Sequence, residues 1–122
     1  MRYLIDGYNL AHWLARDDDL RPDQLRLLLL TALGRRRPRD ATRIEVYWDV
    51  RRPNPSVPAR EDLGWCVQFN VPDADAAIVD AVYDADQPRR CVVVSRDREA
   101  TGRSKQLGAR TKAPGDLLGK RR

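Results

Sequence analysis

Three aspartates of this 122-residue chain stand just after apolar runs. Asp6 and Asp49 follow such runs directly, and Asp97 follows one within three residues. Singly, each aspartate is also typical of a turn or of a helix cap. Carboxylate oxygens are hard ligands that suit Mg²⁺ or Mn²⁺, and a bound ion of this kind supports phosphoryl chemistry. Taken together, the three aspartates indicate a divalent-metal site.

Two further acids extend this set. If a helix begins near residue 72, Asp75 shares a face with Ile78 and Val82, because successive helical residues advance by about 100°. A carboxylate amid an apolar face needs a cation, a metal or a proton, whereas in an exposed first turn the helix dipole alone would favour it. Glu99 stands two residues beyond Asp97, and this pair alone would also be explained as a helix cap.

The remaining residue types narrow the choice of metal. The chain holds one histidine, His12, and two cysteines, Cys66 and Cys91, which lack the spacing of a zinc site. We interpret His12 as a surface or packing residue and the cysteines as buried small hydrophobic residues. Oxygen donors without a thiolate or an imidazole suit Mg²⁺ or Mn²⁺ and suit zinc poorly. The predicted metal ligands are Asp6, Asp75, Asp97 and Glu99.

Apolar runs and helical spacing alternate along the chain and define the elements that would position these acids. Strands are predicted at residues 2–6, 44–49, 65–71, 91–94 and 109–111. Helices are predicted at residues 9–14, with Asn9 as the cap, and at 22–34, 72–86 and 97–106. This alternation predicts an α/β fold, a three-layer sandwich around a central parallel sheet of four to five strands. Because the carboxyl ends of parallel strands meet at one edge, the acids should converge there.

Length and composition predict one domain at residues 1–118 and a basic tail at 119–122. The longest apolar runs, Leu27–Leu30 and Cys91–Val94, are far shorter than the roughly 20 residues that span a bilayer. The N-terminus lacks the apolar region of a signal peptide. We therefore expect a cytoplasmic protein with no membrane segment, and the sequence leaves homodimerisation open.

Positive charge is concentrated toward the two ends of the chain. The net charge is +5, and 20 of the 23 basic residues are arginine, which suits bidentate phosphate contact. Residues 1–60 carry a net charge of +4, residues 61–87 of −7 and residues 88–122 of +8. This pattern favours a polyanion ligand such as RNA, although an arginine-rich surface that aids solubility would give the same composition. The predicted phosphate contacts are Arg51, Arg52, Arg96, Arg98, Arg103 and Lys105, with Arg35–Arg39, Arg89, Arg90 and the tail as further candidates.

Several of these segments resemble the NYN domains of the PIN-like nuclease superfamily, most closely the YacP-like branch. The segment from Tyr3 to Leu10 contains Asp-Gly-Tyr-Asn and is similar to the opening strand and turn of that family. Val46–Asp49 resembles its second strand, Asp73–Ala76 its acidic helix start, and Val94–Glu99 its Ser-x-Asp-x-acid segment. The resemblance covers nearly the whole chain and implies a PIN-like fold.

The resemblance also implies roles for individual residues. Asp6, Asp75 and Asp97 match metal-binding aspartates, Glu99 matches a further acid, and Asn9 matches the polar residue that orients the first-strand site. It implies a metal-dependent ribonuclease, with these residues as the catalytic group and Mg²⁺ or Mn²⁺ as the cofactor. Water would attack the RNA phosphodiester and leave a 5′-phosphate and a 3′-hydroxyl.

A second hypothesis is an RNA-binding or partner-binding module with the same fold and little activity. Where YacP-like sequences often have Ala-Asp-Asp, this chain has Ala74-Asp75-Ala76, which removes one acid and would weaken a second metal site. A phosphotransferase with a nucleophilic aspartate is disfavoured, because Tyr8 stands where its general acid would be required. The sequence does not decide whether the substrate is RNA or DNA, or whether cleavage is endonucleolytic or exonucleolytic. It also does not decide whether a protein partner is the ribosome or another protein.

Overall fold

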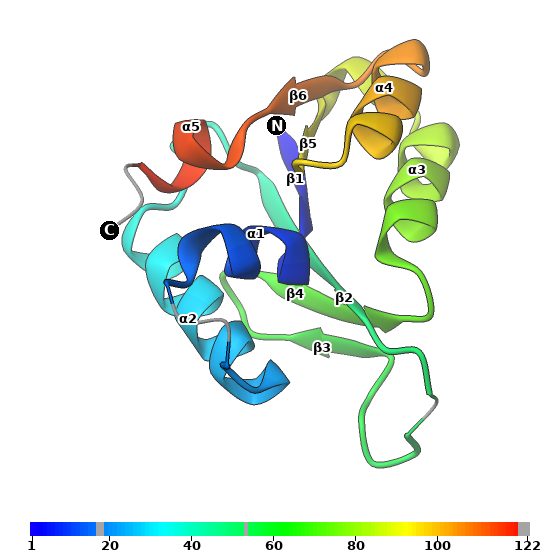
Figure 1. The fold of residues 1–122 in the computed structure, drawn as a ribbon. Coiled ribbons are helices and arrows are strands. Elements are labelled where there is room, and N and C mark those ends of the chain that lie inside the picture. The colour runs from blue at the N-terminus through cyan, green and yellow to red at the C-terminus, as the bar shows by residue number, and fades with distance from the viewer. Residues whose placement is uncertain (17–18, 53, 120–122) are drawn as a thin grey trace.

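The computed structural model describes residues 1–16, 19–52 and 54–119 (Figure 1). Residues 120–122, most of the predicted basic tail, lie outside the described residues. The elements in chain order are β1 (Arg2–Asp6), α1 (Gly7–Leu14), α2 (Pro22–Arg35), β2 (Arg43–Asp49), β3 (Arg60–Asp62), β4 (Val67–Val71), α3 (Ala74–Asp84), the 3-10 turn η1 (Pro88–Arg90), β5 (Cys91–Val94), α4 (Arg98–Gln106), β6 (Arg110–Lys112) and α5 (Pro114–Leu118).

The strands form a six-stranded sheet in the order β3-β4-β2-β1-β5-β6. All neighbouring pairs are parallel except β3 and β4, which are antiparallel. The predicted α/β class with a largely parallel sheet is confirmed, but the prediction of four to five strands is wrong. The additional strand, β3, consists of three exposed polar residues and therefore carries no apolar signal.

The boundary of β4 also differs from the prediction. The strand begins at Val67, whereas a strand over residues 65–71 was expected. The chain turns just before it, because Gly64 has a φ of 89° and Leu63 N donates to Cys66 O across the turn. A positive φ suits glycine, which has no Cβ to clash. This turn returns the chain from β3 into β4.

Apolar side chains cover both faces of the sheet. In β1, Tyr3 and Ile5 belong to a cluster with Leu10 of α1 and Leu29 of α2, because alternate strand residues point to opposite faces. Leu4 belongs to a second cluster on the α3 side. Figure 1 shows α1, α2 and α5 on one side of the sheet and α3 and α4 on the other. This arrangement is compatible with the expected three-layer sandwich.

The helices follow the predicted segments, with two differences. The helix α5 was not predicted, because its five residues are too few to show a helical period. The helix α1 begins at Gly7, directly after β1, so Asn9 lies inside it and the prediction that Asn9 caps it is wrong. No helix in the described ranges is long and apolar enough to cross a membrane. Cys66 and Cys91 are buried free thiols.

Candidate functional site

Three of the predicted acids lie at the carboxyl edge of the parallel strands. Asp6 is the last residue of β1 and is only 4% exposed. Asp97 follows β5, the neighbour of β1 in the sheet, and is the N-cap residue of α4. Asp75 stands in the first turn of α3, which crosses from β4 back over the sheet. The fold therefore brings acids from three distant parts of the chain to one edge.

Asp75 is the centre of this acidic group. Its carboxyl group lies close enough to the carboxyl groups of both Asp6 and Asp97 to share a proton with either of them. Ser95 connects the outer two acids, since its hydroxyl donates to Asp6 Oδ2 over 2.9 Å and accepts from the backbone N–H of Asp97 over 3.0 Å. We call Asp6, Asp75 and Asp97 the carboxyl cluster.

The three carboxyl groups have different electrostatic surroundings. Burial raises the pKa of Asp6, and the nearby charges of Asp49 and Asp97 act in the same direction. Burial and the contacts with Asp6 and Asp97 raise the pKa of Asp75 to about 8. In contrast, hydrogen bonds from the backbone N–H groups of Ala100 and Glu99 lower the pKa of Asp97. Without a cation, the cluster therefore retains a proton on Asp75 at neutral pH.

We expect the metal-free protein to lose stability as the pH rises. The pKa of Asp75 is raised from an ordinary value of 3.8 to about 8 by folding, so the stability that its proton contributes is fully present below about pH 4 and decreases until the pH reaches about 8. Asp75 is partly exposed, so solvent screening reduces the free-energy change between these limits to the order of 2 kcal/mol. Thermal unfolding in EDTA should therefore show Tm falling by several degrees as the pH rises from about 4 to about 8. The Asp75→Asn variant should remove most of this slope, and an equal slope in that variant would contradict the assignment.

The other two predicted catalytic residues have different environments. Glu99 is exposed and lines a pocket of about 170 Å³ together with Asp75, Asp97 and Arg103. Within the described part of the chain, the Asn9 side chain meets a backbone group and not a carboxyl group of the cluster. Its Oδ1 instead accepts from the backbone N–H of Arg96 over 2.8 Å. Asn9 thus ties α1 to the segment between β5 and α4, and it positions the chain that carries Asp97.

Two residues contribute to the site in ways that the sequence analysis did not identify. Ser95 bridges Asp6 and Asp97, and its place in the Ser-x-Asp segment was the available signal. Asp49 accepts from the N–H of Ala74 over 2.7 Å, so it fixes the start of α3. An aspartate after a strand gives no indication of which backbone N–H group it will meet. Its charge still acts on Asp6.

Most of the predicted phosphate contacts lie near the carboxyl cluster, whereas two of the further candidates lie at the opposite edge of the sheet. Arg51 and Arg52 follow β2, and Arg96 and Arg98 flank Asp97, so these four lie at the edge of the carboxyl cluster. Arg103 lines the acidic pocket itself. The exposed Lys105 lies farther along α4 and does not line that pocket. The further candidates Arg89 and Arg90 precede β5 and therefore lie at the opposite edge.

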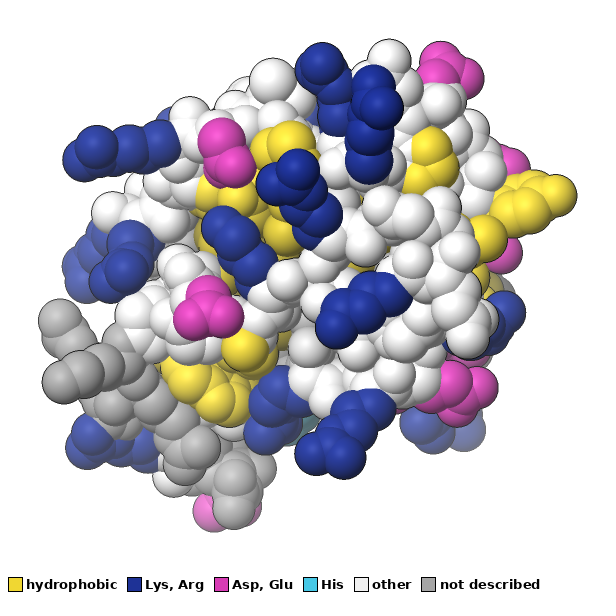
Figure 2. Space-filling view, turned by 90° about the horizontal axis from the view of Figure 1, so that it is seen from above, with side chains coloured by type: hydrophobic (Ala, Val, Ile, Leu, Met, Phe, Trp, Pro, Cys, Tyr) yellow, Lys and Arg dark blue, Asp and Glu magenta, His cyan; other side chains and the backbone are white. Residues whose placement is uncertain are grey.

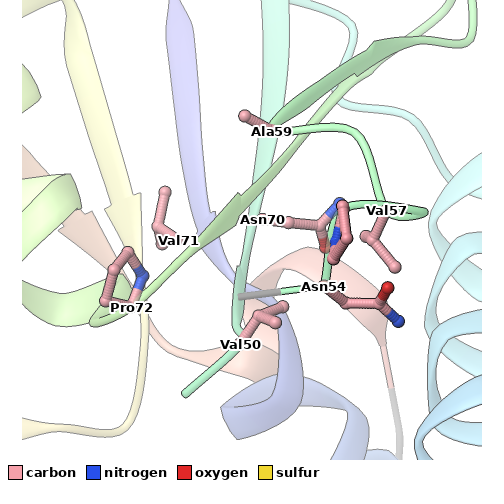
Figure 3. A pocket seen from close by; sticks show the side chains of 8 residues that line it. Val50, Asn54, Val57, Ala59, Asn70, Val71 and Pro72 are labelled. Carbon is pink, nitrogen blue, oxygen red and sulfur yellow. The ribbon is translucent and has the colours of Figure 1, made fainter. Parts of the chain in front are cut away.

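A separate, mainly apolar pocket of about 290 Å³ opens between the ends of β2 and β4 and the loop that follows β2 (Figure 3). Val50, Val57 and Val71 are among its lining residues. Asn70 also lines it, and the buried Asn70 Oδ1 has no hydrogen-bond partner. No Asp, Glu, Lys or Arg lines this pocket, so it supplies no charged group to the carboxyl cluster.

The donor set fits a small hard cation, although the carboxyl groups are not arranged around one in this structure. Across the described ranges, no three His, Cys, Asp or Glu side chains form a group that could hold a metal ion as they stand. The carboxyl groups of the cluster instead touch one another in a row, with Asp75 in the middle. Carboxyl groups so close together require a shared proton or a cation between them. A ligand set made up of oxygen atoms alone is the kind that Mg²⁺ and Mn²⁺ prefer.

Comparisons of this chain with known protein families, with curated proteins and with solved structures found no match. The resemblance to NYN domains stays a prediction made from the sequence motifs. The geometry of the carboxyl cluster is therefore the principal observation on which a function can be argued.

Proposed function

We propose that this protein is a metal-dependent ribonuclease, a PIN-like enzyme of the NYN type that hydrolyses RNA phosphodiester bonds. The observation that carries the proposal is the contact of Asp75 with both Asp6 and Asp97 at the carboxyl edge of the sheet. These carboxylates would hold Mg²⁺ or Mn²⁺, with Glu99 at the rim of the same pocket. A bound ion of this kind polarises water and neutralises charge on the phosphate oxygens.

Neighbouring groups of the protein would hold the three carboxyl groups of the cluster in position. Ser95 and the N–H groups at the start of α4 restrain Asp6 and Asp97, while Asp49 restrains the helix that carries Asp75. Asp75 would release its proton when a cation binds, because the ion then compensates the neighbouring negative charges.

Basic residues around the cluster would hold the rest of the substrate. Arg103 lines the acidic pocket, and Arg51 and Arg96 are exposed at the same edge of the sheet. Contacts of arginine with the phosphate backbone do not read the base sequence, and they weaken as salt is added. We therefore propose RNA as the partner and a cleavage that leaves a 5′-phosphate and a 3′-hydroxyl.

Cleavage of labelled RNA and DNA strands with Mn²⁺, with Mg²⁺ and with EDTA tests this proposal. We expect RNA cleavage with either ion and none in EDTA. The Asp75→Asn variant should lose cleavage by about three orders of magnitude while staying folded, because it removes a ligand charge but needs no buried proton. Asp84→Asn, an exposed position at the far end of α3, should cleave like the parent.

The second candidate function is an RNA-binding module without activity. The specific observation that favours it is Ala76, which lines the acidic pocket where the YacP-like pattern often has an acid. Binding of RNA by the parent protein with no turnover under any metal condition would establish this alternative. Turnover that survives in Asp75→Asn would instead place the active site elsewhere.

A further inference from the structure

The edge of the sheet opposite the carboxyl cluster carries a row of arginines. Arg2 at the start of β1 is in register with Arg43 at the start of β2 on one side and with Cys91 at the start of β5 on the other. Arg90 directly precedes Cys91, and Arg110 begins β6. Together with Arg89, these residues form what we call the arginine edge, namely Arg2, Arg43, Arg89, Arg90 and Arg110.

The spacing of this row follows from the sheet. The row crosses four neighbouring strands in the order β2-β1-β5-β6. Neighbouring strands lie about 4.8 Å apart, so the row extends over roughly 15 Å. One strand of a regular nucleic-acid helix carries a phosphate about every 3.4 Å of its axis, so this length covers roughly four phosphates. A row of cations of this length can therefore contact several phosphates of one nucleic-acid strand, although the spacing of the cations is wider than the phosphate repeat.

Two of these arginines are held in place by a buried acid. Glu45 is 1% exposed and accepts from Arg2 over 2.9 Å and from Arg43, while the hydroxyl of Tyr47 donates to it over 2.8 Å. One carboxylate thus faces two guanidinium groups, and this trio keeps a net positive charge. Both arginines remain partly exposed. Side chains that are already ordered lose less entropy when they bind a ligand.

The rest of the edge is also predominantly basic. Arg89, Arg90 and Arg110 are exposed, and Lys112 donates to the hydroxyl of Tyr3. Besides Glu45, three acids lie near this edge: Asp40 accepts from the same hydroxyl of Tyr3, the charge of the exposed Asp116 acts on Lys112, and Asp86 is exposed shortly before Arg89. Figure 2 views this end of the molecule and shows many Lys and Arg side chains, with fewer Asp and Glu side chains between them.

We propose that the arginine edge is a second nucleic-acid contact surface, which binds the sugar-phosphate backbone of RNA remote from the carboxyl cluster. A protein partner is the less favoured ligand, because stable protein interfaces use apolar or aromatic anchors. The exposed large hydrophobic residues of the described chain are Leu27, Leu63 and Tyr83, and none of them belongs to this edge. The choice of RNA over another polyanion rests on the proposed function.

The test measures the affinity of a labelled RNA strand by fluorescence anisotropy in EDTA at several salt concentrations. The variant is Arg90→Ala with Arg110→Ala, which leaves the partners of Glu45 intact. The matched control is Arg16→Ala with Arg60→Ala, which removes the same charge from exposed positions outside the edge. We expect the edge variant to bind about tenfold more weakly at low salt and to lower the salt slope by between about 1.4 and 1.8, with little change in the control.

Three results would overturn this proposal. The first is equal weakening in the edge variant and the control, which would indicate a general charge effect. The second is RNA affinity that neither variant changes. The third is an edge variant that loses affinity for a polyglutamate tract but retains its affinity for RNA, which would identify the edge as a protein-binding surface. Since no metal and no cleavage enter this experiment, its failure is distinguishable from failure of the proposed activity.

Discussion

The Asp97→Asn variant should cleave RNA about a thousandfold more slowly than the parent protein, with little change in Tm. The carboxylate of Asp97 contacts Asp75 in the cluster, so its charge contributes to any cation site there, and a bound ion supplies several kcal/mol of stabilisation to the reaction. Asp97 also accepts from the N–H groups of Glu99 and Ala100 as the N-cap of α4. Asparagine caps helices about as well as aspartate, so the fold should be preserved. Single-turnover cleavage and thermal unfolding measure the two effects.

Glu99→Gln is the matched control for this variant. Glu99 lies two residues away in the same helix start and lines the same pocket, but its side chain is exposed, and the carboxyl groups that act on Asp75 are those of Asp6 and Asp97. We expect a loss of activity of at most about tenfold, which corresponds to roughly 1.4 kcal/mol. Equal losses in the two variants would mean that the pocket as a whole, and not the carboxyl cluster, determines the activity.

The Gly7→Ala variant should have the largest effect on stability. A Cβ at Gly7 would lie 2.4 Å from Cε3 of Trp48, a side chain that is fully buried. The indole has little freedom to move away, because its Nε1 donates to Gln68 over 2.8 Å and Tyr8 packs against its ring. Overpacking of this kind costs about 3 kcal/mol or more. For a domain of this size, Tm should fall by about 10 °C, measured by circular dichroism.

Gly102→Ala provides the control for the glycine substitution. Gly102 lies within α4, and a Cβ there would have no heavy atom within 4 Å. Alanine favours helices over glycine by about 1 kcal/mol, so this variant should be as stable as the parent or slightly more stable. If Gly7→Ala were equally well tolerated, the close approach of α1 to Trp48 would not describe the protein in solution.

Much of the fold was predictable because the chain follows simple periodic patterns. The runs around Leu4 and Val93 are buried on both faces, as a continuous apolar strand requires, and the apolar face predicted for the helix over residues 72–86 buries Ile78 and Val82. The strand β3 was not predictable from periodicity, because its pairing with β4 is made by backbone groups of polar residues. The short helix α5 also lacked enough residues to show a period.

The placement of Asp6, Asp75 and Asp97 at one edge of the sheet was predictable, but their contacts were not. Strand ends indicated that Asp6 and Asp97 would share one edge, and the helical phase of Asp75 indicated that it would point inward. Sequence spacing could not show that Asp75 would lie between the other two, since that depends on how α3 packs on the sheet. It also assigned Asn9 to the helix cap, whereas the side chain bonds the backbone of Arg96.

The carboxyl cluster should bind a divalent cation, and a measurement of Mn²⁺ binding decides whether it does. Titration of metal-free protein with Mn²⁺, followed by electron paramagnetic resonance of the free ion, should show saturable binding in the parent and in Asp84→Asn. Asp75→Asn should lose this binding while remaining folded. Saturable binding of equal affinity in Asp75→Asn, or no saturable binding in the parent, would contradict the account.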